Sequence, residues 1–238
     1  MIALPFALAL ASNSFAAEWT LRSGPARTHV VELYSSEGCS SCPPADDWIA
    51  SLLKARGLWK DFVPVVFHVT YWDYLGWKDR FAEPAFDARQ RAYAAAWGAA
   101  STYTPGLVLD GEEWRGWGGA PPEATRPAGI LTARITAGRI SARFSPAAGA
   151  GPFIVYAARL GFGASSDVAA GENAGRVLRH EFVVLGLARA PMKRTGGAWA
   201  ARLALPPASG PPVGREGLAA RVAGPDGRPA QAAGGFFP

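Results

Sequence analysis

The chain contains two cysteines, Cys39 and Cys42, which are separated by two serines. A β-branched run at residues 28–34 precedes them, and an apolar-periodic segment at residues 43–56 follows. This order predicts a strand, a turn that holds both sulfurs, and a helix. The unpaired N–H groups at a helix start favour thiolate over thiol, and thiolate is the reactive form. The pattern therefore indicates dithiol–disulfide chemistry, with Cys39 as the more exposed, attacking thiol and Cys42 as the resolving one.

The first half of the chain alternates between strand-like and helix-like segments. A nearly unbroken apolar run at residues 62–69 is typical of a strand buried on both faces in a parallel sheet. Residues 84–97 have helical spacing, with a proline in the first turn. A short strand is predicted at 107–109, and the Asp-Gly pair at 110–111 predicts a hairpin turn. These segments predict an α/β domain over residues 18–117.

Residues 118–127 contain three prolines and two glycines, which is typical of a linker. Beyond them, helical periodicity ends and short β-type segments recur between Gly/Pro turns. Strands are predicted at 130–136, 139–144, 152–160, 177–187, 198–205, 217–223 and 229–236. The pattern predicts an all-β domain over residues 128–238, with an immunoglobulin-like sandwich as the natural architecture.

The N-terminal sequence is apolar and uncharged through Ala11. This run is shorter than the roughly 20 residues that span a bilayer. It suits a signal peptide over residues 1–17 that ends in small residues, although no Lys or Arg precedes it. An N-terminal core helix is the alternative. We therefore expect a periplasmic or secreted protein with no transmembrane span.

Composition narrows the classes of partner. Hydrophobic residues make up 49% of the chain and charged residues 18%, as in a globular protein with an ample core. The formal net charge of +5 is spread along the sequence without a run of Lys or Arg. Nucleic-acid binding regions concentrate their positive charge, so the sequence argues against a nucleic-acid partner.

Two further segments are candidates for a substrate site. Thr104–Pro105 directly precedes a predicted strand, the place where the thioredoxin fold has a cis-proline facing its disulfide. The residue before that proline presents backbone groups to an extended polypeptide, so Thr104 and Pro105 are predicted to bind substrate. The aromatic loop after the buried strand lies where α/β folds form their sites. Its Tyr71, Trp72 and Trp77 are predicted to line the same groove, with packing between domains as the alternative.

Residues 31–46, 67–79 and 103–105 together resemble the signature of the domain-of-unknown-function 1223 family, DUF1223. The segment at 171–176 is similar to a further stretch of that family. The resemblance implies an exported bacterial protein with a thioredoxin-like fold. It implies little about the reaction, because the family name records no established function. One departure is the Pro/Gly-rich 118–127, which stands where the last thioredoxin helix would lie.

The favoured interpretation is a thiol–disulfide oxidoreductase that acts on protein thiols or disulfides, with an upstream redox protein as a further partner and no cofactor. Glu37 opposes a very low thiolate pKa, since a nearby anion raises it. One alternative is a non-catalytic binding module whose disulfide is structural. Another is a copper site made by the two thiolates and His68. The scarcity of histidines argues against a metal site, which usually needs more ligands.

Overall fold

The β-branched runs of the first half form two neighbouring parallel strands in the structure, a computed structural model that describes residues 18–149 and 151–238. β2 (His29–Ser35) pairs with β3 (Phe62–His68), and α1 (Pro43–Ser51) lies between them in the sequence. β4 (Gly106–Leu109) pairs antiparallel with the other side of β2. The predicted α/β character of this region is confirmed.

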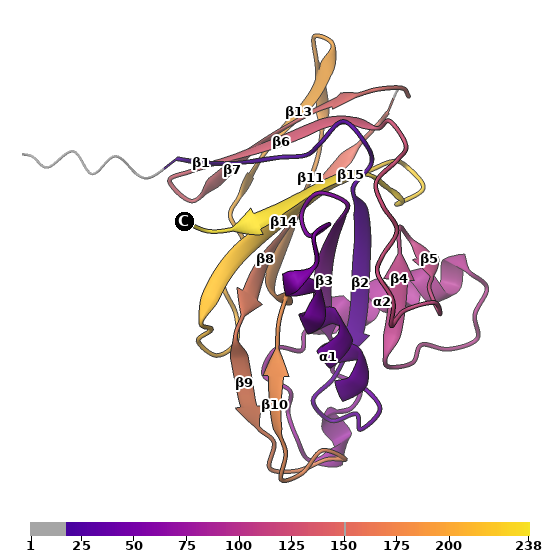
Figure 1. The fold of residues 1–238 in the computed structure, drawn as a ribbon, viewed down its shortest axis with the longest axis vertical. Coiled ribbons are helices and arrows are strands. Elements are labelled where there is room, and N and C mark those ends of the chain that lie inside the picture. Colours follow the sequence, from indigo (N-terminus) through magenta and orange to yellow (C-terminus); the bar gives the residue numbers. More distant parts are fainter. Residues whose placement is uncertain (1–17, 150) are drawn as a thin grey trace, which may run out of the picture.

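The sheet continues into the second half of the chain. It has eight strands in the order β15-β14-β8-β11-β3-β2-β4-β5. β11 joins β3 in parallel where Val183 faces Val66. The added strands are β5 (Glu112–Glu113), β8 (Ile154–Phe162), β11 (Val183–Pro191), β14 (Arg215–Ala223) and β15 (Pro229–Phe236). Strands from both sides of residues 118–127 therefore share one sheet (Figure 1).

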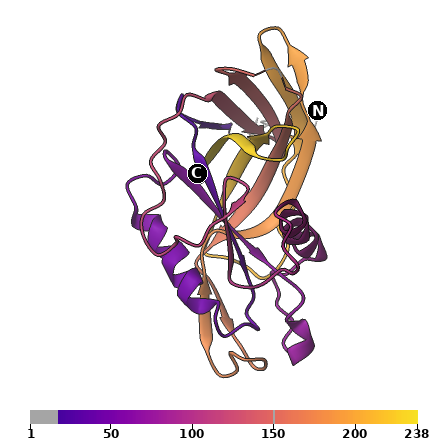
Figure 2. The ribbon, with the colours of Figure 1, turned by 90° about the vertical axis from the view of Figure 1, so that its right-hand side faces the viewer.

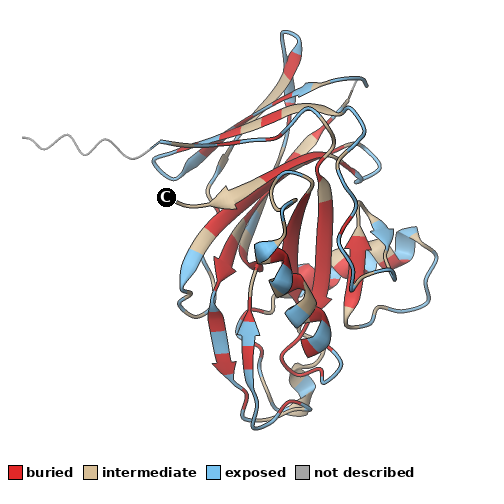
Figure 3. Cartoon of the chain, in the orientation of Figure 1, coloured by how far each residue is buried: buried red, intermediate tan, exposed pale blue. Residues whose placement is uncertain are grey.

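Two helices cover opposite faces of the first-half strands (Figure 2). α1 lies on one face and α2 (Pro84–Ala96) on the other. The helix predicted through residue 56 ends as an α-helix at Ser51 and continues as a 3₁₀ turn, Leu52–Lys54. Buried residues dominate the central strands between the two helices (Figure 3).

A second, five-stranded antiparallel sheet has the order β1-β6-β7-β13-β12. Its strands are β1 (Trp19–Arg22), β6 (Gly129–Thr136), β7 (Arg139–Pro146), β12 (Lys193–Thr195) and β13 (Ala198–Ala204). Leu131, Ile140 and Phe144 on its inner face form a core with Val155 and Leu218 of the eight-stranded sheet. The strand predicted at 130–136 is confirmed as β6, and β1 joins it from the first half of the chain. The mostly antiparallel β character predicted after residue 128 is confirmed.

The strand predicted at 177–187 is two strands in the structure. β10 (Val177–His180) pairs with β9 (Ala164–Asp167), and β11 begins at Val183. The interruption coincides with Phe182, whose φ of 58° is left-handed and incompatible with a continuous strand. Within the part of the chain that the structure describes, no helix has the length and apolarity needed to cross a membrane.

Candidate functional site

Cys39 and Cys42 lie in the turn between the carboxyl end of β2 and the start of α1. Cys42 is the residue that caps the helix, and its N–H donates to the Cys39 carbonyl at 3.2 Å. Pro43 and Pro44 occupy the next two positions and have no N–H to offer. The first turn of α1 therefore offers fewer amides to stabilise a thiolate than the sequence pattern predicted.

Side-chain donors, together with the Ser41 backbone, surround the Cys39 sulfur. The Thr104 hydroxyl donates to Cys39 Sγ at 3.2 Å, and Ser41 Oγ lies 3.2 Å from the same atom. A hydrogen bond from the Cys42 thiol is the main cause that lowers the pKa of Cys39 to about 5, while burial opposes it and Ser41 and Thr104 add to it. Burial and the bond to Cys39 raise the pKa of Cys42 well above its ordinary value. The two thiols are thus chemically unequal.

The expected difference in exposure between Cys39 and Cys42 is absent at the level of whole residues. Both cysteines are free thiols, and each has 0% of its surface accessible. The Cys39 sulfur is nevertheless surrounded by hydroxyl and thiol groups as well as hydrocarbon. The pair is therefore covered within a polar turn.

Trp72 and Thr104, two of the predicted substrate residues, lie at this sulfur. Trp72 Nε1 donates to Thr104 Oγ1 at 2.7 Å, which fixes the hydroxyl that bonds Cys39. The peptide bond between Thr104 and Pro105 is cis, as predicted. Gly38 allows Trp72 to approach, because a Cβ at Gly38 would lie only 3.0 Å from the Trp72 Cβ.

Tyr71 and Trp77 support the turn without contacting either sulfur through a hydrogen bond. The Tyr71 hydroxyl donates to Gln90 Oε1 at 3.1 Å, and Gln90 Nε2 donates to the Tyr103 carbonyl at 2.7 Å. Trp77 Nε1 donates to Glu37 Oε2 at 2.6 Å. Of the three aromatic residues predicted for the groove, Trp72 lies closest to the cysteines by these contacts.

A surface hollow lies beside Pro105. Its walls include Tyr103, Trp114 and Trp117. Trp48 of α1 packs edge-on against Trp114, with ring centroids 5.5 Å apart, so the wall is held rigid from behind. From the sequence, Trp114 and Trp117 could line a groove or pack between domains, with packing favoured, because nothing local places them next to residue 105.

The turn at residues 171–175 covers the cysteines from the second half of the chain. Asn173 is fully buried and donates through Nδ2 to the carbonyls of Glu37 at 3.0 Å and Cys39 at 2.9 Å. Glu172 accepts hydrogen bonds from both the N–H and the hydroxyl of Ser40. The sequence predicted no role for either side chain, although residues 171–176 were similar to a stretch of the DUF1223 family.

A buried polar cluster lies behind the turn. His180 Nε2 lies 3.0 Å from Glu37, and His68 Nδ1 lies 2.7 Å from Asp79. Burial lowers the pKa of His68, but the Asp79 carboxylate outweighs it and raises that pKa to about 9. His68 is thus held as a cation, which is a poor metal ligand. Across residues 18–149 and 151–238, no cluster of three His, Cys, Asp or Glu is arranged to hold a metal, so the alternative copper set with His68 is not assembled.

Asp46 is the acidic residue in the first turn of α1. Its Oδ2 accepts a hydrogen bond from Ser35 at 2.9 Å, beneath the turn. Loss of solvent raises the pKa of Asp46 to about 6, and the Asp46 charge in turn contributes to the raised pKa of Cys42.

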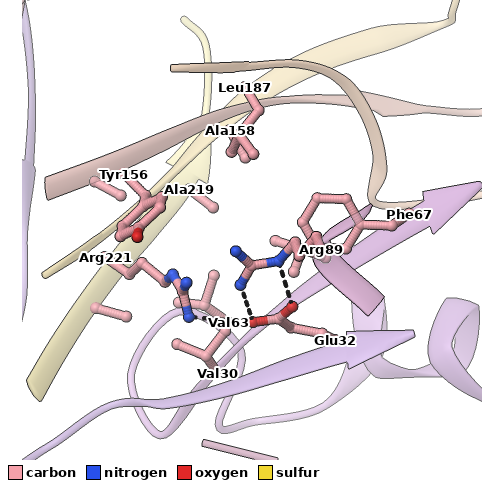
Figure 4. Close-up of a pocket in the computed structure, with 13 residues that line it drawn as sticks. Val30, Glu32, Val63, Phe67, Arg89, Tyr156, Ala158, Leu187, Ala219 and Arg221 are labelled. Atoms are coloured by element: carbon pink, nitrogen blue, oxygen red, sulfur yellow. Dashed lines mark hydrogen bonds and ion pairs between the residues drawn. The ribbon is translucent and has the colours of Figure 1, made fainter. Parts of the chain in front are cut away.

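A second buried ion cluster lies on the opposite face of the sheet, around Glu32 (Figure 4). Arg89 donates to both carboxylate oxygens of Glu32, at 2.9 and 2.6 Å, and Arg221 lies 3.2 Å from one of them. Burial raises the pKa of Glu32, but the two guanidinium groups outweigh it and lower that pKa to about 2. Val30, Val63 and Ala158 surround the cluster with apolar surface. The cluster ties β2, α2 and β14 together.

The Cys39 environment gives a testable pH dependence. Because the pKa of Cys39 is lowered to about 5, the thiolate is present at neutral pH and is lost only as the pH falls through about 5. We expect the rate of alkylation of Cys39 by iodoacetamide in the folded protein to stay flat above pH ~6 and to fall below it. A midpoint near the ordinary thiol pKa of about 8.5 would contradict this.

Comparisons with known proteins bear on the fold and the family. The crystal structure of protein AGR_C_4864 from Agrobacterium tumefaciens is similar at 23% identity and a TM-score of 0.61, covering 90% of this chain and 96% of that one. HBP35 of Porphyromonas gingivalis is similar at 12% identity and a TM-score of 0.56, covering 90% and 76%. Both likenesses concern the fold. No curated protein matches the chain. The sequence profile of the family described as "Protein of unknown function (DUF1223)" matches residues 30–222, and the chain belongs to that family.

Proposed function

We propose that the protein is a thiol–disulfide oxidoreductase that acts on protein thiols or disulfides through Cys39 and Cys42. The observation that carries the proposal is the inequality of the two thiols. Cys39 is held as a thiolate by hydroxyl and thiol donors, while burial keeps Cys42 protonated. An attacking thiolate and a resolving thiol require this division.

With a disulfide substrate, the exchange takes two steps. The Cys39 thiolate attacks one substrate sulfur, forms a mixed disulfide and releases the other substrate sulfur as a thiolate. Cys42 then loses its proton and attacks Cys39 Sγ, which forms the Cys39–Cys42 disulfide and releases the second substrate thiolate. The substrate gains two electrons and the protein loses two, so a partner dithiol must reduce the pair again. A more oxidising partner runs the same steps in reverse.

The polypeptide groove follows from the same geometry. Thr104 borders the Cys39 sulfur, and the next residue, Pro105, lines the hollow walled by Tyr103, Trp114 and Trp117. We infer that an extended substrate chain lies along this hollow, with its backbone at Thr104. The βαβ unit, with its two cysteines at the start of α1, supports a thioredoxin-like assignment for the N-terminal part. The predicted signal peptide, residues 1–17, lies outside the described residues, and we propose export to the periplasm or secretion on the sequence pattern alone.

A trapping experiment tests the proposal. In Cys42→Ser the resolving step is blocked, so incubation with a disulfide-bonded peptide should give a stable mixed disulfide at Cys39, seen by mass spectrometry of the non-reduced protein. The double variant Cys39→Ser/Cys42→Ser is the matched control and should give none. Absence of the adduct in Cys42→Ser at neutral pH, with the fold intact by circular dichroism, would remove the basis for the proposal.

A second candidate is a non-catalytic binding module whose disulfide is structural. The complete burial of both cysteines and the Asn173 contacts over them favour it. A redox titration separates the two candidates. Structural disulfides of exported proteins have potentials below about −300 mV, whereas exchanging pairs lie higher, between about −270 and −120 mV.

A further inference from the structure

The outer face of the five-stranded sheet gathers charge that is scattered in the sequence. Along each of its strands, alternate side chains point away from the core. Those positions carry six cations and one carboxylate. The cations are Arg22, Arg134, Arg139, Arg143, Lys193 and Arg202, and the carboxylate is Glu18. The face therefore holds five net positive charges, equal to the formal net charge of +5 of the whole chain.

Strand register spaces these cations evenly. Arg22 and Arg143 lie on either side of Thr132, and Arg134 and Arg202 lie on either side of Ser141. Each pair is therefore two strand spacings apart, roughly 10 Å. Arg134 contacts Glu18 at 3.1 Å. Among the described residues, Arg139, Arg143 and Arg202 have no side-chain partner, so their guanidinium forks are free to bind phosphate oxygens.

The side chains between the cations restrict the kind of partner. They are small or hydroxyl-bearing, as at Thr132, Ser141 and Ala200. The outward positions described for this sheet include no aromatic residue, so it lacks the stacking platform that single-stranded nucleic acids use. It also lacks the buried aromatic anchors that dominate protein interfaces. An extended layer of negative charge matches such a face better than a point ligand does.

The position of the face fits a layer of this kind. The inner side of the sheet packs on β8, β14 and β15, so the outer side points away from the molecule. Figure 1 places the sheet at the opposite end of the long axis from the turn that follows β2, where the cysteines lie.

We propose that this face, defined by Arg22, Arg134, Arg139, Arg143, Lys193 and Arg202, binds the phosphate groups of an anionic phospholipid bilayer. Held this way, the protein directs its cysteine turn towards water, where polypeptide substrates are. The proposal goes beyond the thiol chemistry and does not depend on it.

Vesicle binding of the full chain tests the proposal. We expect the protein to sediment with vesicles that contain phosphatidylglycerol and not with phosphatidylcholine vesicles, and added salt should weaken binding. The variant Arg134→Gln/Arg143→Gln/Arg202→Gln should bind about 100-fold more weakly, since each basic residue near such a surface contributes ~1 kcal/mol. The matched control Arg56→Gln/Arg91→Gln/Arg179→Gln removes three exposed arginines elsewhere and should bind within about threefold of the original.

Three outcomes would overturn the proposal. The first is no binding to phosphatidylglycerol vesicles at low salt. The second is an equal loss in both triple variants, which would indicate a general effect of net charge. The third is tighter binding of duplex DNA than of vesicles through the same three arginines, which would assign the face to nucleic acid. Circular dichroism of both variants establishes that they are folded, and a Cys39→Ser/Cys42→Ser protein should bind vesicles as the original does.

Discussion

Replacing Cys39 with serine is expected to abolish disulfide exchange. Serine keeps a donor and acceptor near the Thr104 and Ser41 hydroxyls, so the turn is retained, but its hydroxyl is not ionised at neutral pH. Removal of a nucleophile costs several orders of magnitude, and we expect a loss of at least ~10³-fold. The measurement is reduction of a disulfide-bonded peptide with dithiothreitol as the electron source.

Ser51→Ala is a suitable control for this measurement. Ser51 lies exposed at the end of α1 and donates to the Trp48 carbonyl, away from the sulfurs. Its variant should retain turnover within about twofold. If Cys39→Ser turned over substrate as fast as the original protein, another group would have to be the nucleophile, and the function proposed for the cysteine turn would be wrong.

Glu32→Ala is expected to cause the largest loss of stability. The change leaves the Arg89 and Arg221 guanidinium groups beside apolar surface without their carboxylate. Breaking a buried ion pair by removing one partner costs ~3–5 kcal/mol. Since domains are stable by only ~5–15 kcal/mol, this is a large fraction of the free energy of unfolding. Urea titration followed by tryptophan fluorescence measures it.

The pH dependence provides an independent check on Glu32. Its pKa falls from the ordinary 4.5 to about 2 on folding, so its contribution is fully present above about pH 4.5 and is lost as the pH falls towards 2. The difference in stability between the original and Glu32→Ala should narrow over that interval. Glu18→Ala is the control, because Glu18 and Arg134 are both exposed and such pairs contribute ~0–1 kcal/mol. A loss in Glu32→Ala no greater than that in Glu18→Ala would contradict the assignment.

Local patterns predicted the parts of the fold that depend on near neighbours in sequence. The strand, cysteine turn and helix at residues 29–51 follow from the apolar periodicity and the two prolines. The cis peptide bond between Thr104 and Pro105 was expected from its place directly before a strand. The joining of β11 to β3 was not predictable, because it pairs Val183 with Val66, more than a hundred residues away, and no local pattern links them.

The same limit applies to the site. Glu37 and His180 are 143 residues apart, so no local pattern pairs them. Cys39 is covered partly because Asn173, from the second half, bonds to its carbonyl. The arginines of the five-stranded sheet look dispersed in sequence, since alternate positions on separate strands converge only once the register is known. The parts of the site that the sequence did not predict are therefore those that depend on pairing between distant segments.

The sheet shared by both halves has a consequence for how this protein can be divided. A fragment that stops at residue 117 would leave β3 with an open edge and the apolar side of β2 and β3 without β8 and β11, which invites aggregation. The reciprocal fragment would lose β1 and the strands that complete its larger sheet. Neither half should survive as an independent module, so recombination could transfer the cysteine turn to another protein only together with the strands near the carboxyl terminus.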